Sequence, residues 1–407
     1  MEENAKRKRS FVSPIIATAF ALFAMLFGSG NIVLPLGLGR ELGSMATYAM
    51  VGFFLTAVLV PMLGIVAMAL YDGNYREFAH RIGKVPGEIV IAICLALMGP
   101  FCIIPRCMTV SHSALQWIFP QLSLFYFTLV MAVIIFLATV YKSGVVSLMS
   151  FVLGPLKSIL LSFVIIKGIF VAQTVLPCSY PWWQTLVKGF SEGYGTLDLL
   201  AVLILSGLLL DNLRKNPEGG DRSKKEIITL LIKAGLIGSL MLGVMYAGFV
   251  YVAASQSGLE QCITAERTKL LSILASIVLG AGGGILASLT IAIACSTTAI
   301  ALTAVFADYL NTELPQQTST CCSFLNHGSV RYVFCLLATL CVAIFFANYG
   351  FEGIQNFLYP IVSVLYPALI VLAFTNIMYK AWNFDLGKSP FYITLIVAFV
   401  TQFARYW

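Results

Sequence analysis

Phe27-Gly28-Ser29-Gly30-Asn31 lies in the middle of the first long apolar run of the chain, which extends from residue 11 to residue 38. The run is long enough to cross a bilayer, which takes about 20 apolar residues. Glycine, serine and asparagine are poor helix formers, and Pro35 soon afterwards also disfavours a continuous helix. Backbone opened at membrane depth is tolerated only where protein buries it or where it lines a wet cavity. The stretch therefore predicts a broken first helix, with a site for ions and a small solute near the bilayer midplane.

The composition places the chain among integral membrane proteins. Of its 407 residues, 59% are hydrophobic and 11% are charged, whereas charged residues make up about 25% of a soluble domain. The net charge of +7 does not indicate nucleic-acid binding, because the basic residues are divided among short loops. The basic group Lys6-Arg7-Lys8-Arg9 precedes an apolar run that is too long for a signal peptide and lacks a cleavage site. We therefore expect a retained first span and a cytoplasmic N-terminus.

Apolar runs of bilayer length divide the chain into about eleven predicted spans. The runs cover residues 11–39, 46–70, 87–114, 122–141, 145–171, 182–211, 228–254, 276–306, 331–348, 353–378 and 389–405. We interpret the polar segments between them as loops of a single transmembrane domain, residues 1–407. When the loops alternate from a cytoplasmic N-terminus, most basic residues fall on the inner side, which supports this division into spans. We therefore expect a multi-pass protein of a cytoplasmic (inner) membrane.

A second interruption is predicted in the sixth apolar run. There Gly193-Tyr194-Gly195-Thr196-Leu197-Asp198 follows a tryptophan pair, Trp182-Trp183, of the kind found at membrane interfaces. One reading is a second broken helix, and the other is a surface loop that leads into one ordinary helix. Paired interruptions at corresponding positions of two halves are typical of a transporter site. Because no residue-level repeat is visible, the correspondence between the two interruptions depends on their positions alone.

A further polar group lies in the eighth predicted span. Ala294, Thr297 and Thr298 occupy positions i, i+3 and i+4 and so share one helix face. One carbonyl and two hydroxyls suit a hard cation such as Na⁺, which prefers oxygen ligands. Carbonyls just before the first break, at Ala24 and Phe27, could add to this set. The alternative is that both threonines bond to their own helix backbone, as they often do in transmembrane helices.

Two charged residues fall well within predicted spans, Arg106 in the third and Asp198 in the sixth. A charge at mid-bilayer costs several kcal/mol, so we expect both to face protein or water and to have a role in coupling or gating. Asp198 could serve an ion or a proton. It could also form a structural pair or cap the half-helix after the break.

The same residues argue against two other classes of membrane protein. The 3 histidines and 10 cysteines form no metal motif, and the spans hold isolated charges and no catalytic cluster, so a membrane-embedded enzyme is disfavoured. A channel would need rings of charge or pore-lining repeats, and none is visible. A transporter of a small apolar amino acid or another small solute remains.

In these motifs and in their order, the chain resembles the branched-chain amino acid:cation symporters, the bacterial LIVCS family typified by the BrnQ proteins. The matching segments cover most of the chain: Leu26-Phe27-Gly28-Ser29-Gly30-Asn31 with Pro35, Gly99-Pro100-Phe101-Cys102-Ile103-Ile104-Pro105-Arg106 continuing to Ser111, Gly193-Tyr194-Gly195-Thr196-Leu197-Asp198, Ala294-Cys295-Ser296-Thr297-Thr298-Ala299-Ile300, and Pro360 with Tyr366-Pro367.

The resemblance implies a leucine-transporter-type fold, which is an all-α membrane protein with a 5+5 inverted repeat and broken helices 1 and 6. The first repeat would cover about residues 11–171, the second about 182–378, and an extra C-terminal helix about 389–405. Family members usually have twelve spans, so the count of about eleven is a departure. The resemblance further implies symport of leucine, isoleucine and valine with Na⁺, or alternatively with H⁺. It implies no cofactor beyond that ion.

The resemblance also implies which residues hold the ion and the amino acid. Na⁺ would be bound between the first break and the eighth span, by Ala24, Phe27, Ala294, Thr297 and Thr298. The substrate carboxylate would meet the amides of Ser29 and Gly30, and the amino group would meet carbonyls near Thr196. The remaining residues expected around the substrate are Asn31, Gly195 and Leu197.

Overall fold

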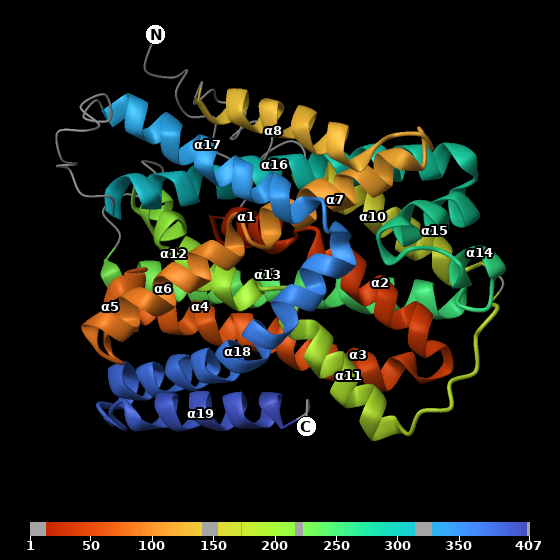
Figure 1. The fold of residues 1–407 in the computed structure, drawn as a ribbon. Coiled ribbons are helices and arrows are strands. Elements are labelled where there is room, and N and C mark those ends of the chain that lie inside the picture. Colours follow the sequence, from red (N-terminus) through yellow and green to blue (C-terminus); the bar gives the residue numbers. More distant parts are fainter. Residues whose placement is uncertain (1–13, 141–153, 172, 216–222, 314–327, 405–407) are drawn as a thin grey trace, which may run out of the picture.

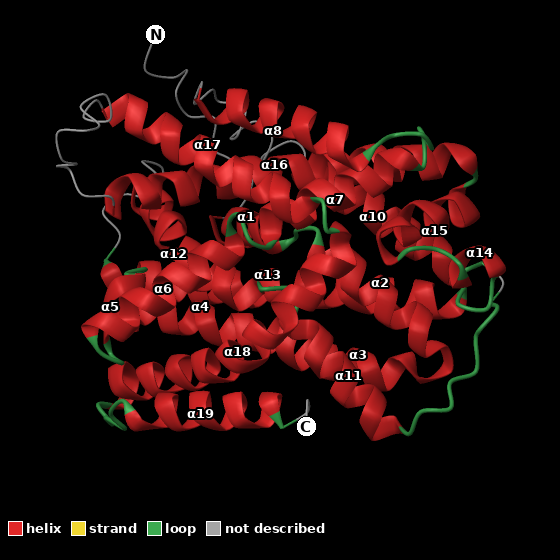
Figure 2. Ribbon diagram, in the orientation of Figure 1, coloured by secondary structure: helices red, strands yellow, loops and turns green. Residues whose placement is uncertain are grey.

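The computed structural model of the chain describes residues 14–140, 154–171, 173–215, 223–313 and 328–404. Two features named above fall outside these ranges: the basic group Lys6-Arg7-Lys8-Arg9, and residues 145–153 at the start of the fifth predicted span. The regular structure within the described ranges is helical, and Figure 2 draws no strand there. The predicted all-α class is therefore confirmed.

The first half of the chain forms helices that are mostly joined by short turns. They are α1 (Pro14–Leu26), α2 (Gly30–Leu42), α3 (Ala46–Phe54), α4 (Val60–Leu70), α5 (Tyr75–His80), α6 (Lys84–Met98), α7 (Ile103–Gln116), α8 (Leu124–Val140) and α10 (Gly154–Ile169). A 3₁₀ turn, η1 (Gly43–Met45), joins α2 to α3, and a π-helix, η2 (Leu55–Leu59), joins α3 to α4.

The second half has three long helices of more than 30 residues and several shorter ones. The helices are α11 (Trp182–Tyr194), α12 (Asp198–Lys215), α13 (Lys224–Ser255), α14 (Glu260–Ile263), α15 (Leu270–Leu279), α16 (Ala281–Glu313), α17 (Gly328–Ala347), α18 (Gly350–Trp382) and α19 (Ser389–Phe403). A short 3₁₀ segment, η5 (Arg267–Lys269), precedes α15. In Figure 1, the axes of α4, α13 and α16 lie nearly parallel across the bundle, and α2 is tilted relative to them and leads into α3.

Among the described residues, six helical stretches are long and apolar enough to cross a membrane: Gly30–Leu70, Lys84–Gln116, Lys224–Ser255, Ala281–Glu313, Val330–Ala347 and Gly350–Trp382. Shorter apolar helices are Ile15–Leu26, Leu124–Val140, Ser158–Ile169 and Ser389–Phe403. The stretch Gly30–Leu70 contains half of the first predicted span and the whole of the second. The two are joined in one helical stretch because the turn between them, η1, is itself a 3₁₀ helix. The predicted total of about eleven spans stays a prediction.

Two predicted spans differ from the structure in detail. The eighth was expected over residues 276–306, but α15 ends at Leu279 and α16 begins at Ala281. Gly280 between them has φ +77°, a conformation that glycine adopts without steric cost. The third was expected over residues 87–114, but its helix is interrupted at residues 99–102, between α6 and α7.

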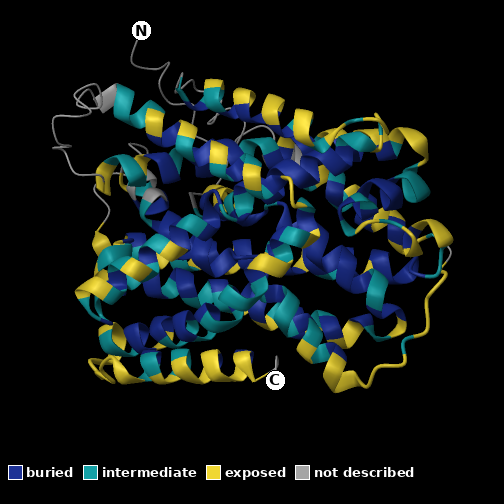
Figure 3. Ribbon diagram, viewed as in Figure 1, coloured by how far each residue is buried: buried dark blue, intermediate teal, exposed yellow. Residues whose placement is uncertain are grey.

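The distribution of buried residues fits a bundle surrounded by lipid. Figure 3 shows buried residues concentrated in the middle of the bundle and exposed ones on its outermost helices, α8 and α19. The exposed side chains of these two helices are large and apolar, for example Val130 and Ile134 on α8 and Ile396 and Phe399 on α19. A broad apolar surface of this kind indicates contact with another apolar phase, and we interpret these faces as lipid-facing.

Small residues bring α3 and α11 into close contact. A Cβ atom at Gly189 would lie 1.9 Å from the carbonyl oxygen of Ala49, and one at Gly52 would lie 2.0 Å from that of Leu186. Small residues allow transmembrane helices to approach each other backbone to backbone. This packing fixes α11 against α3 and so helps to position the segment that follows α11.

We expect Gly189→Ala to lower the melting temperature of the detergent-solubilised protein, because the new methyl group must push α3 and α11 apart at a cost of about 1–3 kcal/mol. Gly282→Ala is the matched control, since a Cβ there meets no atom within 4 Å. Thermal unfolding of both variants followed by size-exclusion chromatography makes the comparison. Equal melting temperatures would contradict the close packing of α3 against α11.

Candidate functional site

The first span is broken where the sequence predicts it. α1 ends at Leu26 and α2 begins at Gly30, so the residues between them leave the helix. The Gly28 amide donates a hydrogen bond to Oδ1 of Asn31, 3.2 Å away, and so finds an acceptor that a continuous helix would have supplied. At the start of α2 the first amides have no acceptor within their own helix, as at every helix N-terminus.

The sixth predicted span is also broken, as the broken-helix reading predicts. α11 ends at Tyr194 and α12 begins at Asp198. Between them Leu197 has φ +63°, a left-handed conformation that costs a residue other than glycine about 1–3 kcal/mol. Its side chain is fully buried. Thr196 Oγ1 donates to the Gly193 carbonyl at 3.0 Å, which closes the turn from within.

The two breaks meet around one small buried cavity. Its volume is about 30 Å³, which is enough for about one water molecule. Its wall contains seven residues that the sequence had singled out: Ser29, Gly30, Asn31, Arg106, Thr196, Asp198 and Thr298. The remaining wall is apolar: Met25, Leu26, Met98, Ile103, Ala201, Leu205 and Leu302, together with the backbone of Gly28. We refer to this space as the central cavity.

Three side chains, which we call the Asn31 network, join the two breaks to the long helix α13. Nδ2 of Asn31 donates to both carboxylate oxygens of Asp198, each 2.9 Å away, and also to the hydroxyl of Tyr246. The Tyr246 hydroxyl in turn donates to Oδ2 of Asp198 at 3.0 Å. All three side chains are buried. A buried carboxylate is tolerated when several donors satisfy it, and the network supplies them.

Arg106 stands at the other side of the same region. Its guanidinium Nη1 donates to the Gly195 carbonyl at 2.7 Å, so α7 is bonded directly to the second break. The guanidinium carbon lies 4.9 Å from the centre of the Phe351 ring on α18. Gly195, one of the residues predicted to contact the substrate, thus uses its carbonyl to bind Arg106. Gly195 and Leu197 are not part of the cavity wall.

The predicted Na⁺ ligands are brought together only in part. Thr298 lines the central cavity, and its methyl group would lie 3.9 Å from a Cβ at Gly28. The hydroxyls of Thr297 and Thr298 both donate to the Ala294 carbonyl, at 2.8 and 3.1 Å, which is the backbone bonding weighed as the alternative. The four predicted ligands outside the cavity wall are Ala24, Phe27, Ala294 and Thr297. The sodium site stays a prediction.

Sequence reasoning assigned no role to two tyrosines that hold the second break. Tyr246 belongs to the Asn31 network, and the hydroxyl of Tyr366 accepts a hydrogen bond from the Leu199 amide at 3.2 Å. Tyr366 also packs against Tyr194, with ring centres 4.9 Å apart. The available signal was a tyrosine in the middle of an apolar span, since a buried phenol usually has a hydrogen-bond partner.

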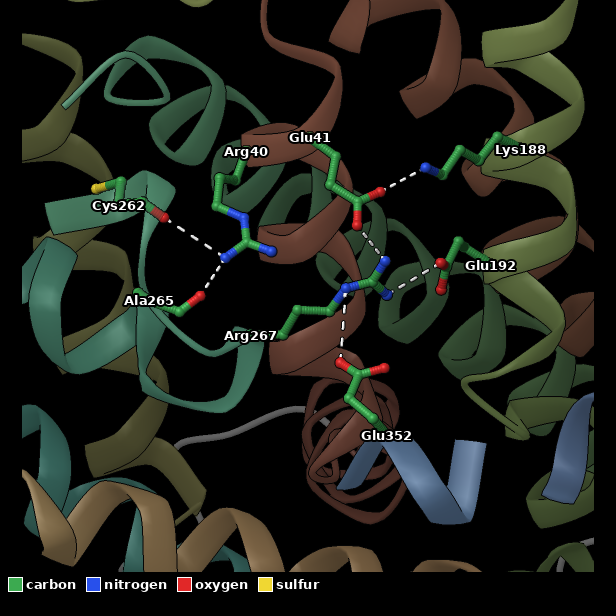
Figure 4. Close-up of polar contacts among 8 residues, drawn as sticks. All are labelled: Arg40, Glu41, Lys188, Glu192, Cys262, Ala265, Arg267 and Glu352. Carbon is green, nitrogen blue, oxygen red and sulfur yellow. Dashed lines mark hydrogen bonds and ion pairs between the residues drawn. The ribbon is translucent and has the colours of Figure 1, made fainter. Parts of the chain in front are cut away.

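A cluster of charged residues closes one end of the bundle, and we call it the Arg267 cluster. Figure 4 shows Arg267 between three carboxylates from three helices: Glu41 of α2, Glu192 of α11 and Glu352 of α18. Its guanidinium is paired with Glu41, with Glu192 at 3.1 Å and with Glu352 at 3.7 Å. Lys188 completes the cluster through Glu41, at 2.5 Å. The cluster therefore ties the C-terminal end of α2 to α11 and α18.

Arg267 remains charged in this setting. Burial lowers the pKa of its guanidinium, but the carboxylates of Glu192, Glu41 and Glu352 outweigh burial and raise that pKa above its ordinary value. Beside the cluster lies a second, larger cavity of about 430 Å³, whose wall includes Trp183, Lys188, Glu192, Arg267, Glu352 and Tyr359. Sequence reasoning gave Arg267 no role. It did not predict these pairs, because their members come from distant parts of the chain.

Solved structures show which known fold this arrangement matches. The inward-facing conformation of Mhp1 superimposes with a TM-score of 0.62 at 14% sequence identity, covering 96% of this chain and 89% of Mhp1. A manganese transporter from Eremococcus coleocola gives a TM-score of 0.56 at 15% identity, covering 96% of this chain and 85% of that one. At such low identity the likeness concerns the fold alone, and it confirms the leucine-transporter-type architecture.

Sequence relatives identify the family. The chain is 30% identical to the branched-chain amino acid permease BraB of Bacillus subtilis, over 91% of this chain and 81% of the permease. It is 27% identical to the branched-chain amino acid permease BrnQ of Escherichia coli K12, over 94% and 84%. A family model described as branched-chain amino acid transport protein matches residues 12–405. The chain therefore belongs to the family of branched-chain amino acid transport proteins.

Proposed function

We propose that this protein is a secondary active symporter that imports leucine, isoleucine and valine together with Na⁺ by alternating access. The observation that carries the proposal is the meeting of two helix breaks around the central cavity. Transporters place substrate and coupling ion at such paired breaks. The names of the relatives supply the substrate class, since BraB and BrnQ are both called branched-chain amino acid permeases.

The central cavity has the chemistry that a branched-chain amino acid requires. The start of α2, at Ser29 and Gly30, would accept the carboxylate, because helix N-terminal amides and the helix dipole favour anions. Carbonyls near Thr196 would accept the ammonium group. The apolar wall, for example Met98 and Leu205, would contact the side chain. A greasy pocket separates substrates that differ by one methylene by only about 1–3 kcal/mol, so broad specificity follows.

The Arg267 cluster would act as the outer gate of this transporter. The bias of basic residues toward the loops expected on the cytoplasmic side supports an extracellular position for the Arg267 end of the bundle. There the cluster ties α2 and α11, which are halves of the two broken spans, to α18. Because the central cavity of about 30 Å³ is smaller than a leucine, substrate entry requires these half-helices to move. Breaking the Arg267 pairs would release them toward the outside.

Coupling would arise because Na⁺ and the amino acid stabilise the same closed state. A ligand shifts a conformational equilibrium by its difference in affinity between the states, and two ligands that prefer one state strengthen each other's binding reciprocally. Thr298 lies both on the predicted ion face and on the wall of the central cavity. Thr298 is therefore the residue at which the proposed ion site and the proposed substrate site would adjoin.

In proteoliposomes, we expect an inward Na⁺ gradient to drive accumulation of radiolabelled leucine, with isoleucine and valine competing. A Na⁺ ionophore should collapse the accumulation. A proton gradient applied without Na⁺ tests the alternative coupling ion. Uptake that responds to neither gradient would remove symport from the proposal, and leucine uptake that an excess of valine and isoleucine leaves unchanged would contradict the substrate class.

We expect Thr298→Ala to raise the Na⁺ concentration that gives half-maximal leucine uptake, because one oxygen ligand is lost; a loss of about 1.4 kcal/mol corresponds to roughly tenfold. Thr290→Ala is the matched control, since the Thr290 hydroxyl donates to the Leu286 carbonyl on the same helix at 2.8 Å and Thr290 is not part of the cavity wall. Identical Na⁺ dependence in the two variants would take Thr298 out of the ion site.

We expect Arg267→Gln to shift the protein toward conformations open at the Arg267 end, because three carboxylates lose their shared cation. Hydrogen exchange followed by mass spectrometry should show the amides at the ends of α2 and α11 exchanging about tenfold faster, a change of about 1.4 kcal/mol in opening free energy. Lys269→Gln is the control, as Lys269 pairs with its helical neighbour Glu266 at 3.5 Å. Unchanged exchange in Arg267→Gln would refute the outer gate.

A further inference from the structure

We propose that Arg106 binds the carboxylate of the substrate directly, so that the central cavity recognises the zwitterionic backbone of a free amino acid between Arg106 and Asp198. This inference rests on the proposed function, since it assigns the charge recognition of that same site. Five observations support it: the state of the guanidinium, its neighbours at the start of α2, its geometry, the position of Asp198 and the absence of an internal counter-ion.

The guanidinium of Arg106 is buried but only partly bonded. The residue is 1% exposed, and its Nη1 is used by the Gly195 carbonyl. Its Nε and Nη2 are buried and have no hydrogen-bond partner among the described residues. Leaving donors of a charged group unbonded in a dry interior costs free energy, so the site is built for an acceptor that the protein itself does not supply.

The unbonded side of the guanidinium points at the start of α2. A Cβ atom built at Gly30 would lie 2.4 Å from Nη2 of Arg106, so the two residues are in direct contact, and both line the central cavity. The first amides of α2 and the helix dipole already make this place positive. A cation beside a helix N-terminus is unfavourable by itself. An anion bound in the cavity beside the guanidinium and the first amides of α2 would be stabilised by both.

The geometry of the free edge matches a carboxylate. Nε and Nη2 lie on one edge of the planar guanidinium, opposite the Nη1 that holds Gly195. Two parallel N–H donors on one edge can bind both oxygens of a carboxylate, which is the arrangement in which arginine is strongest and most selective. The bond from Nη1 to the Gly195 carbonyl at 2.7 Å fixes the plane and so presents this edge to the cavity.

The opposite charge lies on the wall of the same cavity. Asp198 is 1% exposed, and the donors of Asn31 and Tyr246 hold its carboxylate in place. Among the residues that the structure describes, no ion pair within 4.0 Å joins Arg106 to Asp198 or to another carboxylate. Two buried opposite charges that line one cavity without pairing with each other suit the two charged groups of a free amino acid, its α-carboxylate and its α-ammonium.

A purely structural role for Arg106 would involve Nη1 alone, as a brace on the second break. The two roles differ in what they predict for ligands. A brace affects every ligand of the site equally, whereas a carboxylate-binding group affects only ligands that carry a carboxylate. Leucinamide keeps the ammonium group and the side chain of leucine and replaces the carboxylate by a neutral amide, so it separates the two roles.

The experiment is a thermal-shift titration of the purified protein in detergent with leucine and with leucinamide, both in Na⁺. A ligand that binds only the folded state stabilises it by RT ln(1 + [L]/Kd), so the melting temperature measured against ligand concentration reports the affinity. For Arg106→Gln we expect leucine affinity to fall roughly 100-fold, the size typical for loss of one partner of a buried charge pair, while leucinamide affinity changes less than about threefold. Arg106→Lys keeps the charge without the planar edge and should lose roughly tenfold for leucine.

Arg81→Gln is the control for loss of an arginine, because Arg81 pairs with Asp385 at 2.6 Å, away from the cavity. If Arg106→Gln does not fold, Arg106→Lys carries the comparison. Equal loss for leucine and leucinamide in the variants, or a wild type that binds the two equally, would overturn the inference. Failure of the proposed function has a different signature, namely a wild type that no branched-chain amino acid stabilises.

Discussion

A transmembrane helix that opens in mid-membrane must find partners for its freed backbone groups within the protein, and this constraint organises the structure. Asn31 helps to meet this requirement at both breaks. Its Oδ1 accepts from the Gly28 amide of the first break, and its Nδ2 donates to Asp198, the first residue after the second. One side chain thereby stabilises two interruptions that are 167 positions apart in sequence. Tyr246 anchors the pair to α13, so the breaks cannot drift independently.

α2 is the element on which most of this depends. Its start carries the Asn31 network and lies against Arg106, and its end carries Glu41 of the Arg267 cluster. A movement of this single half-helix would therefore be felt at both depths, at the binding cavity and at the charged end of the bundle. The proposed alternating access requires this property of a moving part, because α2 would couple the proposed substrate contacts at its start to the proposed gate at its end.

The breaks could be predicted from sequence because they are local. Glycine, serine and asparagine in an apolar run indicate the first break, and the segment from Gly193 to Asp198 indicates the second. The importance of Arg106 and Asp198 could also be predicted from sequence, because a charged residue within a span is costly unless it faces protein or water. Partners were not visible: Arg106 bonds a carbonyl on another helix, and Arg267 gathers carboxylates from three helices. Such pairings depend on how the helices stack, and no local pattern records that.

The contact between Gly30 and Arg106 has a consequence for how this site can change. A side chain at position 30 would occupy the space of the guanidinium, while a shorter residue at position 106 would free that space and abandon the Gly195 carbonyl. A substitution at either position alone would therefore disturb this contact, whereas a paired substitution could preserve the packing. Substitutions at the two positions are thus expected to be epistatic: a larger residue at position 30 would be tolerated better together with a smaller one at position 106.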